Sequence, residues 1–306
     1  MRSRARREGR AVEEGLPSPL KAIEGKSRNV DHRVVKGFGE EWSRFGNRQL
    51  EVDELETMFS HYTSVFPWED LPEDAEGFDA GCGSGRWARF FAPRVGRLHC
   101  IDASEAALDV ARQTLANETN VEFRHEDLSS LGLEDASCDF GYALGVLHHI
   151  PDTEHAVATC AAKLKPGAPF LVFLYHDLEN YGWLHRLLFL RVVTAIRFVV
   201  ARLPSKPRSL VADLVAALVY WPLARLARVV EMVGRDPAFL PLFQYRHRSF
   251  YVMRNDSLDR FGTRLEKRYS REEVRRLLES AGLGKVVFSE GPPWWVAVAW
   301  RRHEGL

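Results

Sequence analysis

The stretch from Glu76 to Trp87, EGFDAGCGSGRW, carries the most specific chemistry in the chain. A short apolar run ends at Asp79, three glycines follow at alternate positions from Gly81 to Gly85, and a helix-compatible segment begins at once. A strand that ends in a glycine turn and leads into a helix brings backbone N–H groups to the mouth of a βαβ unit. Glycine is needed there because a Cβ would block a ligand and because positive φ is cheap only for glycine. The stretch therefore predicts a ligand-binding turn.

The spacing of this turn indicates which ligand it binds. It reads G-x-G-x-G after an acidic residue, whereas dinucleotide-binding turns read G-x-G-x-x-G. A pyrophosphate is best held by amides with no anion nearby, while an acidic residue suits a ligand that carries an ammonium group. S-adenosylmethionine (SAM) has an ammonium group, an adenosine and no phosphate. An ordinary tight turn is the alternative interpretation, and the downstream residues distinguish the two.

A second acidic residue, Asp102, follows a short predicted strand over Leu98–Ile101. A carboxylate at this strand end, about twenty residues beyond the first glycine, is placed to accept both hydroxyls of a ribose. Ser104 then caps an alanine-rich helix that runs to about Leu115. A carboxylate stabilised by the dipole of that helix is the alternative role for Asp102.

These motifs together resemble the class I SAM-dependent methyltransferases. FDAGCGSG resembles motif I of that family, and GVLHHIPD at Gly145–Asp152 resembles the V-L-H-H-x-P-D run of members that act on quinones and other small molecules. The turn at Leu164–Gly167 is similar to the same family. The resemblance covers about Phe78–Trp300 apart from an insert. It implies SAM as the cofactor and a small-molecule methyl acceptor as the partner.

The resemblance also implies roles for single residues. In the family, Asp127 would accept from the adenine amino group while Leu128 packs on the ring; a solvated loop carboxylate is the alternative for Asp127. Leu144 and Gly145 would lie beside the methionine part of SAM. The expected cofactor-binding residues are Asp79, Gly81, Cys82, Gly83, Gly85, Asp102, Ala103, Asp127, Leu128, Leu144 and Gly145.

Three residues at strand ends are candidates for catalysis: His148, His149 and Tyr175. Any of them is a candidate base if the acceptor must lose a proton. Adjacent histidines point in different directions, so at most one is expected to face substrate. A packed or capping histidine is the alternative for each. The cysteines form no C-x-x-C or Cys/His pattern, and no metal site is expected.

The expected fold is α/β: a Rossmann-like, mostly parallel seven-stranded sheet with helices on both faces, an N-terminal helical cap, and a helical insert before the last two strands. Glu76 and Gly77 imply that the first strand is short or frayed. Further strands are predicted over Val121–Arg124, Asp139–Leu144, Phe170–Tyr175, Lys285–Ser289 and Trp294–Trp300. The last of these is expected to be antiparallel to the others.

Two segments outside the core bear on the substrate. The FGEEWSRF segment at Phe38–Phe45 resembles a helical cap over the SAM pocket, with a plain helical hairpin as the alternative. Tyr181–Arg235 is helical, apolar and basic, and its longest uncharged run, Leu214–Ala224, is far short of the roughly 20 residues of a membrane span. It is expected to roof a wide apolar substrate pocket, to contact a membrane peripherally through a basic amphipathic surface, or both.

The polar stretch Arg254–Tyr269 precedes the last helix, which a capping box at Ser270–Glu273 opens. From this stretch Asn255, Asp256 or Arg260 is placed to reach the pocket, with surface contacts as the alternative. The expected organisation is a basic disordered tail (1–30), a helical cap (31–75), a SAM-binding core (76–180), the insert or substrate cap (181–245) and the C-terminal part of the core (246–306).

Composition excludes little but sets the environment. The chain has 306 residues, formal charge zero and 27% charged residues, so no charge excess points to nucleic acid or to an anionic membrane. The N-terminus shows no secretory signal and the cysteines suit a reducing compartment, so a cytoplasmic protein is expected. The predicted function is methyl transfer from SAM to a small, lipophilic or aromatic acceptor. A non-catalytic SAM-binding regulatory or partner subunit is the alternative; the oligomeric state is not addressed by the sequence.

Overall fold

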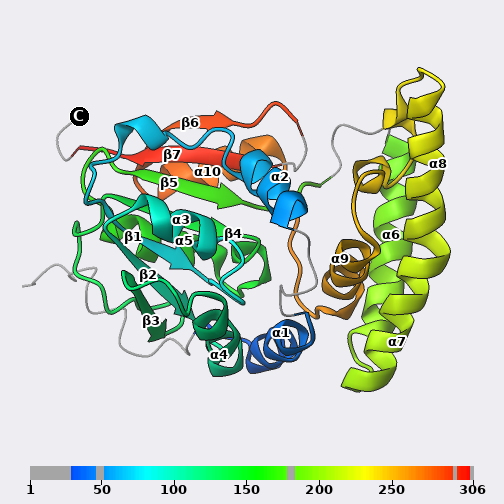
Figure 1. The fold of residues 1–306 in the computed structure, drawn as a ribbon, viewed down its shortest axis with the longest axis horizontal. Helices are drawn as coiled ribbons and strands as arrows, with labels where there is room; N and C mark the ends of the chain where they lie inside the picture. The colour runs from blue at the N-terminus through cyan, green and yellow to red at the C-terminus, as the bar shows by residue number, and fades with distance from the viewer. Residues whose placement is uncertain (1–28, 46–51, 178–182, 292–294, 304–306) are drawn as a thin grey trace, which may run out of the picture.

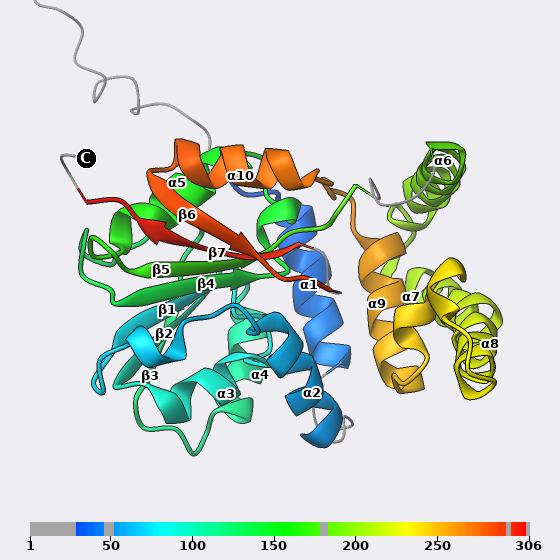
Figure 2. The same cartoon turned by 90° about the horizontal axis from the view of Figure 1, so that it is seen from above.

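The structure, a computed structural model, describes residues 29–45, 52–177, 183–291 and 295–303. Its centre is a seven-stranded sheet in the order β3-β2-β1-β4-β5-β7-β6 (Figures 1 and 2). Strands β1 to β5 are parallel, and β7 runs antiparallel to both β5 and β6. The predicted Rossmann-like, mostly parallel sheet is therefore confirmed. The strands are β1 Glu76–Ala80, β2 Arg97–Asp102, β3 Val121–His125, β4 Phe140–Leu144, β5 Pro169–Phe173, β6 Leu283–Phe288 and β7 Val296–Arg301.

Helices cover both faces of this sheet, as expected. Buried side chains of α2, α3 and α4 pack on one face, and those of α5 and α10 pack on the other. Ser104 accepts from the N–H of Ala107 at the start of α4, and Ser270 and Glu273 form the predicted capping box of α10. These helices are α2 Val52–Tyr62, α3 Ala88–Phe91, α4 Glu105–Thr114, α5 Thr153–Lys163 and α10 Arg271–Ser280.

Of the two outcomes expected for β1, a short strand or a frayed one, the structure shows a short strand that is regular. It pairs with β2 from its first residue, where Glu76 lies opposite Arg97. Gly77 is required by packing, because a Cβ there would lie 2.3 Å from the ring of Phe140 on β4. The Phe140 ring fills the space that a side chain at position 77 would take, and it packs against the strand that leads into the glycine turn.

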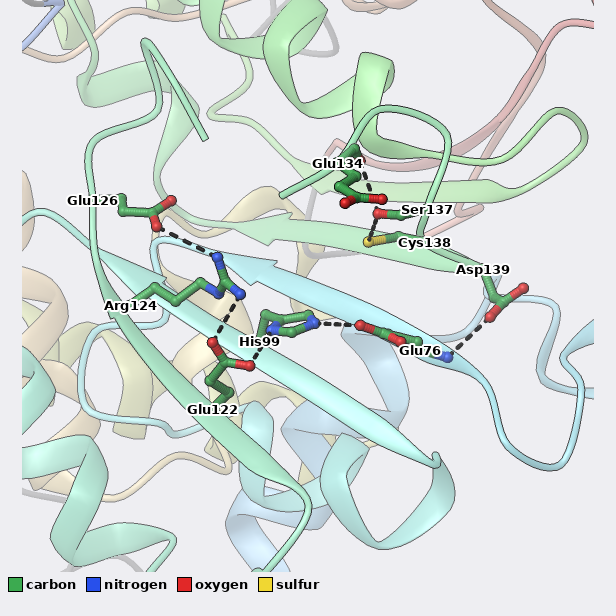
Figure 3. Close-up of polar contacts among 9 residues, drawn as sticks. All are labelled: Glu76, His99, Glu122, Arg124, Glu126, Glu134, Ser137, Cys138 and Asp139. Atoms are coloured by element: carbon green, nitrogen blue, oxygen red, sulfur yellow. Dashed lines mark hydrogen bonds and ion pairs between the residues drawn. The ribbon is translucent and has the colours of Figure 1, made fainter. Parts of the chain in front are cut away.

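A row of charged side chains crosses β1, β2 and β3 (Figure 3). The buried ring of His99 lies between two carboxylates, with Nε2 2.7 Å from Glu76 Oε1 and Nδ1 3.3 Å from Glu122 Oε2. Glu122 also pairs with Arg124 at 2.8 Å, and the backbone N–H of Glu76 donates to Asp139 at 3.0 Å. These contacts join neighbouring strands side by side and so fix where their carboxyl ends lie.

A second layer of helices lies beyond the carboxyl ends of the parallel strands (Figures 1 and 2). Helix α7, a π-helical turn and α8 form one continuous helix from Ser205 to Met232. Helix α9 packs on α6 and α7, while α1 contacts α4 and α9. The elements are α1 His32–Arg44, α6 Trp183–Val200, α7 Ser205–Val215, the π-helix Ala216–Tyr220, α8 Trp221–Met232 and α9 Phe250–Gly262. The predicted tail over 1–30 and the start of the insert at 181 lie almost wholly outside the described residues.

Ion pairs attach this helical layer to the rest of the protein; those of Glu266 are buried, whereas those of Asp213 are partly exposed. The side chain of Glu266 is fully buried and lies 2.5 Å from Arg197 of α6 and 2.8 Å from Arg268. Asp213 of α7 accepts from Arg44 of α1 at 2.6 Å and from Arg254 of α9 at 2.9 Å. Such pairs add little net stability, but removing one partner is costly. They therefore fix the position of α6 and α7 more than they stabilise the fold.

Although its uncharged run Leu214–Ala224 is far shorter than a membrane span, the continuous helix Ser205–Met232 as a whole is long and apolar enough to cross a membrane, judged by length and composition alone. Only 28% of its most apolar stretch is buried in the protein. Its acidic residue Asp213 faces α1 and α9, whereas Leu218 and Met232 expose 73% and 77% of their surface. The helix thus has one charged, packed side and one apolar, exposed side.

Candidate functional site

A cavity lies where the parallel strands end, between the sheet and helices α1 and α9. It brings together residues that are far apart in the sequence, from the glycine turn, the ends of β2, β4 and β5, and three helices. No described residue of α6, α7 or α8 lines it. Helices α1 and α9 cover it among the described residues, and α6 and α7 pack on α9. The polar and aromatic lining includes Phe38, Glu41, Trp42, Tyr62, Arg86, Asp102, Asp127, His149, Tyr175, Asn255, Asp256 and Asp259.

The glycine turn forms one end of the cavity. Gly81 and Gly83 both line it, with φ of +83° and +55°. A Cβ on Gly81 would lie 2.6 Å from Val146, and one on Gly83 would lie 2.8 Å from the indole Nε1 of Trp42. Both positions therefore require glycine for conformation and for space. Gly85 does not line the cavity; a Cβ there would lie 3.1 Å from Leu115, so this glycine serves the packing of α4 against the turn.

Asp79 lies behind the turn, outside the cavity lining. Successive side chains of a strand point to opposite faces, and Asp79 is in register with Tyr142 of β4 in the buried core. Burial raises its pKa well above the usual value. The structure therefore gives Asp79 a place within the sheet, and no direct contact with a ligand in the cavity.

Asp102 joins the glycine turn to the end of β2. Its Oδ2 accepts from the N–H of Gly83 at 2.9 Å and its Oδ1 accepts from the N–H of Ser104 at 2.8 Å. Burial raises the pKa of Asp102, and these two N–H donors oppose that rise. A carboxylate oxygen has two lone pairs, so both oxygens retain capacity for the hydroxyls of a ribose. This arrangement fits the predicted role.

The remaining cofactor candidates all line the cavity: Cys82, Ala103, Asp127, Leu128, Leu144 and Gly145. Asp127 accepts from the N–H of Ser129 at 2.9 Å through Oδ1, which orients the carboxylate. Glu126 also lines the cavity and accepts from the N–H of Gly132 at 2.8 Å. The sequence analysis did not single out Glu126, although it stands next to Asp127 at the same strand end.

His148 and His149 occupy different environments, as adjacent residues should. His148 is fully buried and does not line the cavity; its ring stacks on Tyr175 with centroids 3.9 Å apart. Burial, with help from His149 and Arg268, lowers the pKa of His148 well below its usual value. His148 is therefore a neutral packing residue under Tyr175.

His149 lines the cavity, but both of its ring nitrogens face acceptors. Nδ1 lies 2.7 Å from the carbonyl oxygen of Leu265, and Nε2 lies 3.4 Å from Asp259 Oδ1. A ring between a carbonyl and a carboxylate satisfies both only when both nitrogens carry protons. Burial lowers the pKa of His149, but Asp259 and the Leu265 carbonyl outweigh burial and raise it. Nδ1 is held by the Leu265 carbonyl and Nε2 faces the Asp259 carboxylate, so His149 is better described as a residue that positions Asp259.

Asp259 on α9 is the centre of this network. The hydroxyl of Tyr175 donates to its Oδ2, and His149 faces its Oδ1. Burial raises the pKa of Asp259, but His149, Tyr175 and Arg260 outweigh burial and lower it. Sequence analysis missed Asp259, although Asn255, Asp256 and Asp259 fall on one face of a helix, at spacings of one, three and four residues.

A second polar chain links α1 to α9 and to the glycine turn. Asn255 donates to Glu41 at 2.6 Å and accepts from Arg86 at 3.1 Å. The Arg86 guanidinium also lies 4.8 Å from the ring centre of Trp42. Burial, followed by the charge of Asp259, raises the pKa of Glu41 well above its usual value. Glu41 was not predicted, but it lies in the segment expected to cap the pocket.

Comparison with known proteins places the core in a family. Residues 78–172 match the model of a methyltransferase domain. Ubiquinone biosynthesis O-methyltransferases from Hahella chejuensis and Alkalilimnicola ehrlichii are 36% and 40% identical over 148 and 155 residues, or 46% and 48% of this chain. In both cases the chain covers 60% of the relative's length. A solved SAM-dependent methyltransferase from Methanosarcina mazei has a TM-score of 0.47 and 18% identity, covering 78% of this chain and 99% of that one.

The matches to the domain model and to the two ubiquinone biosynthesis O-methyltransferases agree with the core geometry: residues 78–172 resemble a methyltransferase domain, and this supports SAM as the cofactor. The glycine turn, whose cradle a Cβ would fill, and the carboxylate of Asp102 fit an adenosine-bearing ligand. The matched segment ends before Tyr175. It includes neither α1 nor α9, so the domain model does not extend to the part of the cavity that those helices line.

The first prediction concerns cofactor affinity. Replacing Asp102 by Ala should weaken SAM binding at least about tenfold, because hydrogen bonds to a charged group are each worth roughly 1.5–3 kcal/mol. Isothermal titration calorimetry measures the effect. Asp109→Ala removes an exposed carboxylate of α4 and should bind SAM as the unchanged protein does. Unchanged SAM affinity in the Asp102 variant would refute the ribose role.

The second prediction concerns the charge on His149. Its folded pKa is raised, so the stability that its cation contributes is complete below the usual value, near 6.5, and disappears as pH rises through the raised value. His149→Gln should therefore lower the free energy of unfolding by about 2 kcal/mol near pH 6 and by less at alkaline pH. Urea unfolding across pH measures this difference, with exposed His155→Gln as the control. A difference that grows with rising pH would show that the neutral ring is the preferred form.

Proposed function

We propose that this protein transfers the methyl group of SAM to a small molecule bound between the sheet and helices α1 and α9. The observation that carries the proposal is the extent of the cavity. The glycine turn and Asp102 lie at one end of the cavity. The same cavity continues from there to Tyr62, Tyr175 and the polar residues of α9. A cofactor site alone would need no such second lining.

Bound SAM supplies an activated methyl group on a positively charged sulfur. The chain's own residues act by placement: the glycine turn and Asp102 orient the cofactor, while Phe38 and Trp42 of α1 cover the cavity and exclude water. Holding two reactants in line removes much of the entropic barrier to their reaction. His149 contributes by fixing Asp259, and through it α9, rather than by removing a proton.

The lining supports an aromatic or lipophilic acceptor. Tyr62, Phe173 and Tyr175 line the cavity, and their rings pack edge to face with centroids 5.0–5.6 Å apart. Such walls favour a flat apolar molecule over a sugar. The ubiquinone biosynthesis O-methyltransferases that resemble this core are consistent with a small acceptor.

The third prediction tests catalysis against the alternative of a non-catalytic SAM-binding subunit. A cell extract incubated with the protein and methyl-deuterated SAM should gain a low-molecular-weight product that carries the label, detected by mass spectrometry. The Asp102→Ala variant should form much less of it. SAM binding by calorimetry with no labelled product in any extract would favour the non-catalytic role.

We further infer a peripheral membrane contact through residues 181–235. The described cysteines are free and buried, which suits a protein that works in the cytoplasm. The exposed side of α6–α8 is apolar, with Phe198, Leu214, Leu218 and Val229 at the surface. Its exposed charges include the cations Arg191, Arg202, Lys206 and Arg228, whereas Asp213 and Glu231 pair with arginines of α1, α9 and the loop after α8. An apolar surface with basic edges suits an anionic lipid leaflet.

The ion pairs of Asp213 hold the helix against α1 and α9, so it is placed to lie along the leaflet rather than to cross it. The fourth prediction is co-sedimentation with vesicles of anionic phospholipid that weakens as salt is added. Leu218→Glu should reduce it by placing a carboxylate in the apolar surface, while exposed Asp109→Glu should not. Concentration-dependent dimerisation that Leu218→Glu abolishes, without lipid binding, would assign this surface to a second copy of the chain.

A further inference from the structure

The end of the cavity away from the glycine turn, here called the acceptor end, is lined by more carboxyl groups than cations. Glu41 of α1 and Asp256 and Asp259 of α9 all line it. Asp259 is matched by His149 and Tyr175. Asp256 accepts from the hydroxyl of Tyr245 at 2.8 Å through Oδ2, and Glu41 accepts from Asn255 through Oε1. Among the described residues, the hydrogen bonds of Glu41 and Asp256 use one oxygen each, which leaves the other oxygen of both to a ligand.

The cations of the described lining, Arg86 and His149, are both engaged by protein groups. Arg86 donates to Asn255 and lies over the rings of Trp42 and Trp87, at 4.8 and 5.3 Å from the ring centres. His149 is held between the Leu265 carbonyl and Asp259. The charge of Arg86 also acts on Glu41 and Asp256, and that of Arg260 acts on Asp256. The spare capacity of this end of the cavity is therefore for hydrogen-bond donors on the remaining carboxyl oxygens.

The aromatic lining is an independent observation that points to the same ligand chemistry. Tyr62 of α2 lines the cavity and packs edge to face on Phe173 with ring centres 5.0 Å apart, and Tyr175 and Phe38 line the cavity beside them. Aromatic faces attract cations, most strongly where water is excluded. Carboxyl groups and aromatic faces that converge on one space form the usual protein environment of an organic ammonium ion.

The need to remove a proton from the acceptor also favours an amine. A hydroxyl acceptor becomes a good nucleophile only when its proton is taken, and the lining histidine is directed at the Leu265 carbonyl and at Asp259. An amine provides its own lone pair once its ammonium form loses a proton. Burial raises the pKa of both Glu41 and Asp256, which makes these carboxyl groups better proton acceptors than exposed ones.

We propose that the acceptor is a small aromatic or lipophilic amine, bound as its ammonium ion between Glu41 and Asp256 and methylated on nitrogen. The proposal rests on the methyltransferase function proposed above. The ammonium gives one proton to the carboxylate of Glu41 or Asp256, and that group then releases the proton to solvent. The nitrogen lone pair forms the bond to the methyl carbon while the carbon–sulfur bond breaks, and that electron pair remains on sulfur. The products are the N-methylammonium ion and S-adenosylhomocysteine.

SAM carries an ammonium group of its own, so the test separates cofactor from acceptor. The full chain is first titrated with S-adenosylhomocysteine, and the saturated protein is then titrated with phenethylamine or with phenethyl alcohol, which has nearly the same shape. We expect the amine to bind at least about tenfold more tightly at neutral pH, as a charge-assisted hydrogen bond would produce. Equal or tighter binding of the alcohol would overturn the proposal.

Two isosteric variants test whether Glu41 and Asp256 cause the preference for the amine over the alcohol. Asp256→Asn and Glu41→Gln keep an oxygen that can accept from Tyr245 and Asn255, so the fold should be retained, as circular dichroism and thermal unfolding check. Each should reduce the preference for the amine severalfold and leave the affinity for S-adenosylhomocysteine unchanged. Asp109→Asn, the same change on exposed α4, should keep the preference. Loss of S-adenosylhomocysteine affinity with the amine preference intact would assign these carboxyl groups to the cofactor and overturn the proposal.

The methylated atom is tested with tyramine, which carries an amine and a phenol on one aromatic frame. With methyl-deuterated SAM, fragmentation of the product by mass spectrometry should place the label on nitrogen. Label on the phenol oxygen would overturn the amine proposal while leaving methyl transfer intact. Failure of the unchanged protein to bind S-adenosylhomocysteine in the titration above would instead refute the proposed function itself.

Discussion

The acceptor side of the cavity depends on the contacts of one buried carboxylate. Asp259 receives the hydroxyl of Tyr175, at the end of β5, and faces Nε2 of His149, which follows β4. Through these contacts α9 is fastened to the carboxyl edge of the sheet, although it otherwise packs on α6 and α7. Because a buried carboxylate without partners is costly, α9 is held in the one position that satisfies it. Asn255 and Asp256 reach the cavity as a consequence.

The same constraint explains why a histidine inside the cavity is not free for proton transfer. In a histidine that acts as a base, one nitrogen faces the reacting proton while the other is oriented by a carboxylate or carbonyl. Here Nδ1 of His149 is held by the carbonyl of Leu265, and Nε2 faces the carboxylate of Asp259 at 3.4 Å. The ring thus links the sheet to α9.

The cavity therefore has two parts with different relationships to known proteins. The cofactor end, from the glycine turn to Gly145, lies within the segment that matches a methyltransferase domain. The acceptor end is lined mainly by α1, α2, α9 and Tyr175, which lie outside that segment. A parallel sheet presents its strand ends to whatever covers them, so one cofactor site serves many acceptors when the covering helices change. The chemistry of this chain's acceptor is best sought in Glu41, Asp256 and Asp259.

The sequence by itself determined the sheet, the helices on its faces and the cofactor end, because these depend on local patterns: glycines at alternate positions, an acidic residue at a strand end, a capping box. Gly83 and Asp102 are close in sequence, and their contact follows from adjacent parallel strands. Only the tertiary structure decided the acceptor end. It placed Asp79 and Gly85 outside the lining, buried His148, and brought α9 over the cavity. Glu41 and Asn255 are 214 residues apart yet share a hydrogen bond of 2.6 Å, and no local pattern encodes a contact between two helices so distant in the chain.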